Sequence, residues 1–417
     1  MKTNIVKVKL WGMDVGYLSW DHRRKLALFE YEPEFLNREL DIAPLTMSIY
    51  SPRSQAQIPW DGYREKLFQG LPPMIADSLP DKWGDSLFSA WLRDNNISTK
   101  QTSPVDHLSF IGSRAMGALE YEPAQKLGDS SPFSVDVQML YEFAQKVLNE
   151  RESTILNQEN SILWQDLIKI SSSPGGKRPK AIVALNEKTG KVISGQGQIP
   201  EDFKHFILKY DDNSVYPYAK LEYVYYQMAL DAGIDIKPSQ LREYEGAVHF
   251  LTERFDRDGN EKVHMQTFAA MSPYGTSYED IFEVIRKLKL PHEDVEQQFI
   301  RMAFNVIARN VDDHSKNFSF CMNREGTWRL SPAYDLTFSI DLAASGYVNR
   351  HSLTINRKDD DITFEDLEKI ALQNDVQNYK TLIEKVKDAI ASFESYSRKI
   401  GIDKDLTARI KSKFNII

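Results

Sequence analysis

The stretch that decides the fold runs from Asn310 to Asp335 and reads NVDDHSKNFSFCMNREGTWRLSPAYD. Polar side chains fill most of its first positions, and the stretch ends in a Tyr-Asp pair. Asp312 and Asn317 are five residues apart, and Asp335 follows 18 residues after Asn317. Any one of these residues alone is typical of a helix cap or a turn. Together they are hard to explain as caps, so we interpret the stretch as a candidate site.

The spacing matches what phosphoryl transfer from ATP requires. One carboxylate accepts the proton of the attacking hydroxyl, while an amide oxygen and a second carboxylate hold Mg²⁺ against the phosphates. The catalytic loop of protein kinases has the same step from Asp to Asn, and a hairpin there also leads to a metal-binding Asp. This spacing favours Asp312 as the base, with Asp313 as the alternative, and Asn317 and Asp335 as the ligands of Mg²⁺.

The neighbouring residues predict how this stretch is held. Apolar residues recur at three- or four-residue steps over 292–309, which indicates a helix that leads into the polar block. Residues 317–322 and 327–331 indicate a hairpin that leads on to Asp335. His314 could bind zinc, but no second His or Cys lies nearby at ligand spacing. We expect His314 to brace the loop through hydrogen bonds, and we include it among the ATP-binding residues.

A second candidate element is the segment SSSPGGKRPK at 171–180, which precedes a strand predicted at 181–185. Gly175 and Gly176 have no side chains, so their backbone N–H groups can approach phosphate closely, and the cations that follow suit a polyanion. The alternative is a plain loop, because Ser, Pro and Gly cluster in loops. The position just ahead of a strand favours the phosphate site.

Three further positions are candidates for contacts with the nucleotide. Lys209 closes a buried strand, where it is either an edge residue or a cation for the α- and β-phosphates. Glu222 on the next helix could pair with Lys209 or face solvent. The block ERFDR at 253–257 follows another strand and could bind adenine through its backbone, although a charged loop is equally consistent. Gln266 follows closely and could lie in a cleft between two lobes.

Composition excludes several classes of protein. The chain has 417 residues, which predicts two or three domains, and its 41% hydrophobic and 11% aromatic residues exclude global disorder. The formal net charge of −8 argues against nucleic-acid binding by bulk electrostatics. A single cysteine, Cys321, excludes an internal disulfide and a Cys-rich zinc site. Neither a membrane span nor the apolar block of a signal peptide is found, so we expect a cytoplasmic protein without membrane contact.

The order of the predicted elements indicates an α+β protein with a bilobal, protein-kinase-like fold. Strands come first, a helix follows at 75–91, and helices dominate the last third, among them one at 376–399. The expected parts are an extra N-terminal subdomain at 1–125, a β-rich N-terminal kinase lobe at 126–257 and an all-helical C-terminal lobe at 258–417.

These motifs resemble those of the HipA family of bacterial serine/threonine kinases, the toxins of type II toxin–antitoxin pairs. The resemblance covers nearly the whole chain and is carried by blocks at 79–81, 111–119, 175–181, 253–257, 266–268, 310–317 and 332–335. It implies a protein that uses ATP and Mg²⁺ to phosphorylate a protein hydroxyl, with translation factors such as aminoacyl-tRNA synthetases as the class of substrate. It also implies growth inhibition by protein that is free of a helix-turn-helix antitoxin of the HipB type, the partner through which DNA is contacted.

The resemblance assigns roles to individual residues. Asp312 would be the catalytic base, and Asn317 and Asp335 would hold Mg²⁺. The remaining contacts to ATP would come from Lys209, Glu253, Phe255, Gln266 and Tyr334.

The resemblance also implies self-inactivation. In the family a serine of the glycine-rich loop is phosphorylated, which ejects the loop. That position corresponds to Ser172, with Ser171 and Ser173 as alternatives. The added charge of about −2 would repel the phosphates of ATP.

The chain departs from ordinary protein kinases at two points. Tyr334-Asp335-Leu336 stands where those kinases have Asp-Phe-Gly, as in HipA-like proteins. The residue directly before Asp312 is Val311 and not Arg, so activation through a pocket for a phosphorylated residue is not expected. Two other functions compete with the kinase, namely a catalytically silent scaffold that binds antitoxin and DNA, and a small-molecule kinase of similar design. Retention of Asp312, Asn317 and Asp335 argues against the silent scaffold.

Overall fold

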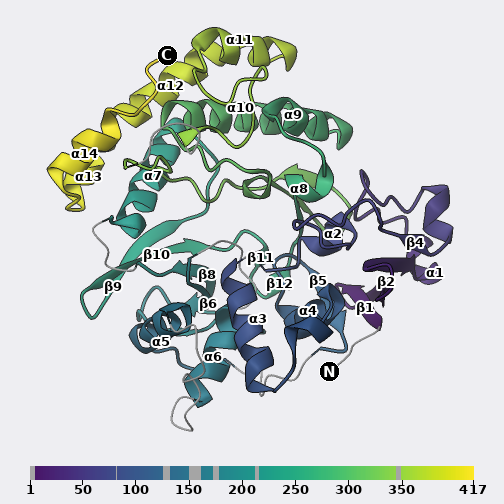
Figure 1. Ribbon diagram of the computed structural model, residues 1–417. Coiled ribbons are helices and arrows are strands. Elements are labelled where there is room, and N and C mark those ends of the chain that lie inside the picture. The colour runs from purple at the N-terminus through teal and green to yellow at the C-terminus, as the bar shows by residue number, and fades with distance from the viewer. Residues whose placement is uncertain are drawn as a thin grey trace. The chain divides into compact units, whose positions relative to one another are not determined.

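Figure 1 shows the computed structural model, which describes residues 5–80, 82–124, 132–149, 161–171, 178–211, 216–343 and 349–417. The chain forms two compact units. Unit 1 comprises residues 1–210, 251–266 and 322–327, and unit 2 comprises residues 211–250, 267–321 and 328–417. The chain contains both helices and antiparallel sheets, and helices dominate its last third, so the predicted α+β class is confirmed.

An antiparallel sheet with the strand order β4-β3-β2-β1-β5 lies in the N-terminal part of unit 1. Its strands are β1 (Ile5–Leu10), β2 (Met13–Asp21), β3 (Leu26–Tyr31), β4 (Ile58–Pro59) and β5 (Leu119–Glu122). In β1 the buried residues Val6, Val8 and Leu10 alternate with more exposed ones, because successive side chains of a strand point to opposite faces. The helices of this part are α1 (Pro33–Leu36), α2 (Pro73–Ala76), α3 (Lys82–Asp94) and α4 (Pro104–Ile111).

The helix predicted over 75–91 is divided in the structure. α2 ends at Ala76 and α3 begins at Lys82, with turns and a bend in between. Pro80 lies in this gap, and a proline has no backbone N–H and disfavours the helical conformation of the residue before it. Trp83 and Leu87 of α3 are fully buried.

A second sheet has the strand order β7-β6-β8-β10-β9. Its strands are β6 (Lys180–Leu185), β7 (Val192–Ser194), β8 (Lys204–Lys209), β9 (Ser239–Tyr244) and β10 (Ala247–Glu253), and the division between the units falls within β10. All residues of β6 are buried, as expected for a strand with neighbours on both edges and a helix on one face. Helix α6 (Ser161–Ser171) packs on β6 and on α5 (Val137–Asn149).

Unit 2 is mainly helical. Its helices are α7 (Tyr218–Ala232), α8 (Phe268–Met271), α9 (Tyr278–Lys287), α10 (His292–Ile307), α11 (Phe364–Gln373), α12 (Tyr379–Ala391), α13 (Phe393–Lys399) and α14 (Lys404–Lys411). The predicted helix before the polar stretch is confirmed as α10. The helix predicted over 376–399 is two helices that meet at Ser392. Phe393, the first residue of the second helix, is buried, and its ring centroid lies 6.4 Å from that of Tyr225 of α7.

Short strands complete the fold. β11 (Arg257–Asp258) pairs with β12 (Glu261–Lys262), and a sheet has the order β13 (His264–Thr267), β14 (Ser319–Met322) and β15 (Trp328–Leu330). β14 and β15 confirm the hairpin predicted between the two polar blocks, the first at 310–317 and the second at 332–335. Among the residues that the structure describes, no helix has both the length and the apolar character needed to cross a membrane.

Candidate active site

The polar stretch of unit 2 begins where α10 ends. Arg309 has a positive φ of 56°, and the backbone N–H of Asn310 donates to the carbonyl of Asn305 (3.0 Å). A residue in the left-handed conformation turns the chain out of a helix, so the polar block forms a loop instead of a further turn of α10. A short 3₁₀ turn, Ser315–Asn317, leads from this loop into β14.

Asp312 is exposed, and its backbone is held on both sides. Its N–H donates to Ser339 Oγ (2.9 Å), which also accepts from the N–H of Val311 (2.7 Å). Its carbonyl accepts from Asn317 Nδ2 (2.7 Å). The structure therefore brings Asp312 and Asn317 into direct contact and leaves the Asp312 side chain accessible to an incoming hydroxyl.

Asp313 is buried although it is the direct neighbour of Asp312. Its carboxylate accepts hydrogen bonds from the Tyr278 hydroxyl (2.7 Å), the backbone N–H of Ser352 (2.7 Å) and His351 Nδ1 (2.8 Å). A carboxylate enclosed by three donors is held in place and has no access to solvent. Of the two aspartates that the spacing left open as the base, the structure exposes Asp312 and buries Asp313.

A chain of buried hydrogen bonds leads from Asp313 back to α10. Asn310 Nδ2 donates to Asn305 Oδ1 (3.0 Å), and Asn305 Nδ2 donates to the Tyr278 hydroxyl (3.0 Å). Burial, together with the charge of Asp313, raises the pKa of Tyr278 well above its ordinary value, so this hydroxyl remains a donor. These bonds attach the loop to both α9 and α10.

The second polar block is attached to the first through Tyr334. Its hydroxyl donates to the carbonyl of Lys316 (2.7 Å) and lies 2.5 Å from Ser319 Oγ. The next residue, Asp335, has a positive φ of 58°, a conformation that Asp adopts more readily than most residues. This backbone conformation sets the direction from which the Asp335 side chain leaves the chain.

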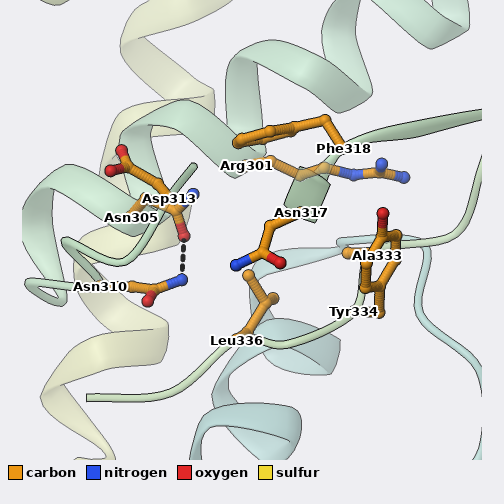
Figure 2. Close-up of a pocket in the computed structure, with 9 residues that line it drawn as sticks. All are labelled: Arg301, Asn305, Asn310, Asp313, Asn317, Phe318, Ala333, Tyr334 and Leu336. Carbon is orange, nitrogen blue, oxygen red and sulfur yellow. Dashed lines mark hydrogen bonds between the residues drawn. The ribbon is translucent and has the colours of Figure 1, made fainter. Parts of the chain in front are cut away.

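A small cavity of about 10 Å³ borders both blocks, and Figure 2 shows the amide of Asn317 among the side chains that line it. It is lined by Arg301, Asn305, Asn310, Asp313, Asn317, Phe318, Ala333, Tyr334 and Leu336. Space of this size holds about one water molecule. Tyr334 and Leu336 flank Asp335 in the sequence, so the segments that carry the two predicted Mg²⁺ ligands meet at this cavity.

The donor types of Asn317 and Asp335, an amide oxygen and a carboxylate, suit a divalent cation. Asn317 Nδ2 donates to the backbone of Asp312, which fixes the amide and directs its Oδ1 away from that bond. Asp335 offers a carboxylate from the adjoining segment. Mg²⁺ commonly takes one or two protein oxygens and completes its coordination with phosphate and water. His314 is half-buried in the same loop, and among the described residues no group of three or more His, Cys, Asp or Glu side chains is placed to hold a metal ion.

Four residues around the loop were missed by the sequence analysis. Arg301 and Asn305 lie four residues apart on the buried side of α10, and burial lowers the pKa of Arg301 to about 10. Two polar side chains one turn apart on the apolar face of the predicted helix could have indicated buried polar contacts at that place. Ser339 and His351 had no such signal, because nothing local relates them to Val311 or Asp313.

Lys209 and Glu253, two of the predicted ATP contacts, lie at strand ends in unit 1. Lys209 is the last residue of β8 and is paired with Lys180 of β6 in the antiparallel register. Glu253 is the last residue of β10, and its carboxylate lies 3.6 Å from Lys204 Nζ. Phe255 is half-buried in the turn that follows β10.

Gln266 is fully buried in β13. Its Nε2 donates to the backbone carbonyl of Ile42, which also accepts from His264 Nε2 (3.1 Å). Burial lowers the pKa of His264 to about 4, so this imidazole is neutral near pH 7. The amide of Gln266 is thus attached to the N-terminal part of unit 1.

Three charged residues of the block at 253–257, namely Arg254, Asp256 and Arg257, form a buried network. Asp256 Oδ1 accepts from Arg254 Nε (2.8 Å), and Oδ2 accepts from Arg254 Nη2 (2.7 Å), Arg257 Nη1 (2.9 Å) and the N–H of Gly117 (2.7 Å). Burial alone would raise the pKa of Asp256, but the two guanidinium charges and the hydrogen bonds outweigh it and hold that pKa well below its usual range. The side chains of Arg254 and Asp256 are therefore enclosed within unit 1.

Four predicted residues of the glycine-rich segment lie outside the described residues, namely Ser172, Ser173, Gly175 and Gly176. Ser171 is the last residue of α6 and is fully buried, and its Oγ has no hydrogen-bond partner within the described part of the chain.

Comparison with known proteins identifies relatives over most of the chain. A family model described as the HipA-like C-terminal domain matches residues 172–393, more than half of the chain, and the HipA N-terminal domain matches residues 6–122. A Sinorhizobium fredii protein named "Putative kinase Y4mE" is 28% identical over 130 residues, which are 27% of this chain and 31% of that protein. The match thus spans about a third of that relative's length.

Solved structures show the fold. HipA from a Shewanella oneidensis MR-1 toxin–antitoxin complex with HipB and operator DNA has a TM-score of 0.66 at 16% identity, covering 98% of this chain and 94% of that one. This likeness shows a common fold. The Helicobacter pylori proinflammatory kinase CtkA matches at 12% identity over 50% of this chain and 84% of its own, with a TM-score of 0.35 that carries no argument about the fold.

Proposed function

The chain belongs to the HipA family, and on this basis we propose that it is an ATP- and Mg²⁺-dependent protein serine/threonine kinase of the HipA toxin type. The observation that carries the proposal is the hydrogen bond from Asn317 to the backbone of Asp312, beside a cavity that also borders the segment around Asp335. The name of the Sinorhizobium relative supports kinase activity in general.

In the proposed reaction Asp312 accepts the proton of a serine or threonine hydroxyl. The oxygen of that hydroxyl bonds to the γ-phosphorus of ATP as the bond from this phosphorus to the β–γ bridging oxygen breaks, and ADP leaves. Mg²⁺ held by Asn317 and Asp335 would supply positive charge beside the phosphate oxygens. Ser339 holds the backbone of Asp312 so that its carboxylate meets the hydroxyl without reorganisation.

The nucleotide would be held by residues of several segments. We assign this role to Gly175, Gly176, Lys209, Glu253, Phe255, Gln266, His314 and Tyr334. The proposed functional parts remain the N-terminal subdomain at 1–125, the kinase N-terminal lobe at 126–257 and the C-terminal lobe at 258–417.

The proposed substrates are proteins, with translation factors such as aminoacyl-tRNA synthetases as the expected class. The proposed regulator is a helix-turn-helix antitoxin of the HipB type that supplies the contact with DNA, an assignment supported by the solved HipA–HipB–operator DNA complex. Self-phosphorylation is assigned to Ser172, with Ser171 and Ser173 as alternatives. The complete burial of Ser171 at the end of α6 favours the other two.

Incubation with labelled ATP and Mg²⁺ tests the proposal. We expect the wild type to label itself and a protein substrate, and Asp312→Asn to lower the rate by about 10²–10⁴-fold while ATP binding by calorimetry is retained. Asp388→Asn removes the same charge on the exposed side of α12 and should leave the rate unchanged. Absence of ATP binding would instead favour the silent scaffold, and turnover of a metabolite without protein labelling would favour the small-molecule kinase. Phosphopeptide mapping separates Ser172 from its neighbours.

A further inference from the structure

The segment 349–360, which we call the strap, contacts the catalytic loop at several points within unit 2. Arg309 Nη1 is paired with the Asp360 carboxylate (2.9 Å), and Arg309 Nη2 donates to the carbonyl of Asn349 (3.1 Å). The N–H of Ser352 lies 3.1 Å from the carbonyl of Val311, and Ser352 Oγ donates to the same carbonyl (3.2 Å). The strap therefore contacts the residues that precede Asp312.

The strap also holds the residue that follows Asp312. Asp313 accepts from the Ser352 N–H and from His351 Nδ1, in addition to the Tyr278 hydroxyl. An ionised carboxylate only accepts hydrogen bonds, so Nδ1 is the ring nitrogen of His351 that carries a proton. Both side chains of this pair are fully buried, which makes the contact short-ranged and directional.

Within the described part of the chain, the side chain of Asp312 has no comparable support. Its carboxylate is exposed, and the hydrogen bonds of this residue involve its backbone N–H and carbonyl. The position of that carboxylate is therefore set by the backbone on either side of it. From this geometry we propose that His351 is a positioning residue, which acts through Asp313 to hold the catalytic carboxylate of Asp312 in line with the phosphoryl acceptor. The proposal rests on the proposed kinase function.

The two nitrogens of His351 make the proposal specific. Nδ1 donates to Asp313, whereas Nε2 is buried without a hydrogen-bond partner among the described residues. An asparagine places its Nδ2 near the position of a histidine Nδ1, so it can make the same donation. Leucine has a similar size but offers no donor. If donation to Asp313 is what matters, His351→Asn retains the function and His351→Leu loses it.

The experiment compares kcat and KM for ATP in these two variants, with hydrogen exchange measured over residues 309–317. We expect His351→Leu to lower kcat by about 10–100-fold with KM for ATP nearly unchanged, and to speed exchange in the loop. His351→Asn should retain most of the wild-type kcat and protection. Val386→Ala, a buried change in α12 away from the loop, is the control for loss of stability.

Each outcome decides the question. Equal losses of kcat in both His351 variants, an unchanged kcat in His351→Leu, or the same loss in Val386→Ala at matched thermal stability would overturn the positioning role. If the wild type transfers no phosphoryl group, the proposed function fails. Hydrogen exchange still decides then whether His351 holds the backbone around Asp312, because it requires no catalysis.

Discussion

Removal of the Asp256 charge by Asp256→Asn is expected to destabilise unit 1 strongly. Asp256 is fully buried and accepts four hydrogen bonds, from Arg254 (two), Arg257 and Gly117. Asparagine has nearly the same shape, so the change leaves no cavity. It replaces one acceptor oxygen with an NH₂ donor that must face donors, and it leaves the guanidinium charges without their carboxylate.

The magnitude follows from those two losses. With its oxygen at the Oδ2 position, asparagine still accepts from three donors but faces Arg254 Nε with its NH₂ group. A lost hydrogen bond to a charged group costs about 1.5–3 kcal/mol. Removing one partner of a buried ion pair costs about 3–5 kcal/mol in total, because the remaining charge is uncompensated. We expect a loss of this size in the free energy of unfolding of unit 1.

Urea unfolding followed by tryptophan fluorescence measures this loss. Six of the seven tryptophans lie in unit 1, so the signal reports mainly on that unit. With a slope of about 1–3 kcal/mol per molar urea, the midpoint should fall by about 1 M or more. Asp258→Asn, an exposed neighbour, is the matched control and should change stability by less than about 0.5 kcal/mol. A midpoint for Asp256→Asn equal to that of Asp258→Asn would refute the reasoning.

The pH dependence gives a second check on the same variant. The pKa of Asp256 is depressed in the folded state, so its stabilising effect is present above the unfolded pKa of about 3.9 and is lost as the pH falls through the folded pKa. The difference between wild type and Asp256→Asn should thus stay constant from pH 7 to about pH 5 and narrow only below about pH 4. Narrowing that begins near neutral pH would show that another group is responsible.

Two other substitutions have defined outcomes. Ser339→Ala removes the acceptor of the Val311 and Asp312 N–H groups, so kcat for phosphoryl transfer should fall by about tenfold. Ser339→Thr keeps the hydroxyl and should restore kcat. Equal kcat values in both variants would contradict this role of Ser339. Burial lowers the pKa of His107 to about 3, so between pH 6.5 and 3 this imidazole takes up a proton only in the unfolded chain. In urea titrations the free energy of unfolding of the wild type should therefore fall by about 2 kcal/mol more than that of His107→Gln between pH 7 and 4.5. Equal decreases in the two proteins would refute this prediction.

Local interactions explain why much of the fold could be predicted. The alternation of β1 and the periodicity of α10 arise from the geometry of one strand and one helix, which a few consecutive residues specify. The two helices predicted without a break, over 75–91 and 376–399, were wrong because a local rule was overlooked in the first and a tertiary contact accompanies the break in the second. Pro80 separates α2 from α3, and burial of Phe393 accompanies the break between α12 and α13.

The candidate groups of the site could be predicted from spacing, but their arrangement could not. The steps from Asp312 to Asn317 and on to Asp335 predict the kinds of group that phosphoryl transfer needs. Spacing did not distinguish the roles of Asp312 and Asp313, because adjacent residues of a loop can face either solvent or the interior. The partners that bury Asp313 come from α9 and from His351, 38 residues further along the chain.

By itself the amino-acid sequence determined the α+β class, most helices and strands, the family and the set of candidate catalytic groups, since each depends on residues close together in the chain. Only the tertiary structure decided that Arg254 and Asp256 close a buried network with Gly117, that Asp312 is the exposed aspartate, and that Ser339 supports it. Burial and long-range hydrogen bonds are properties of residues that folding brings together, and no local pattern records them.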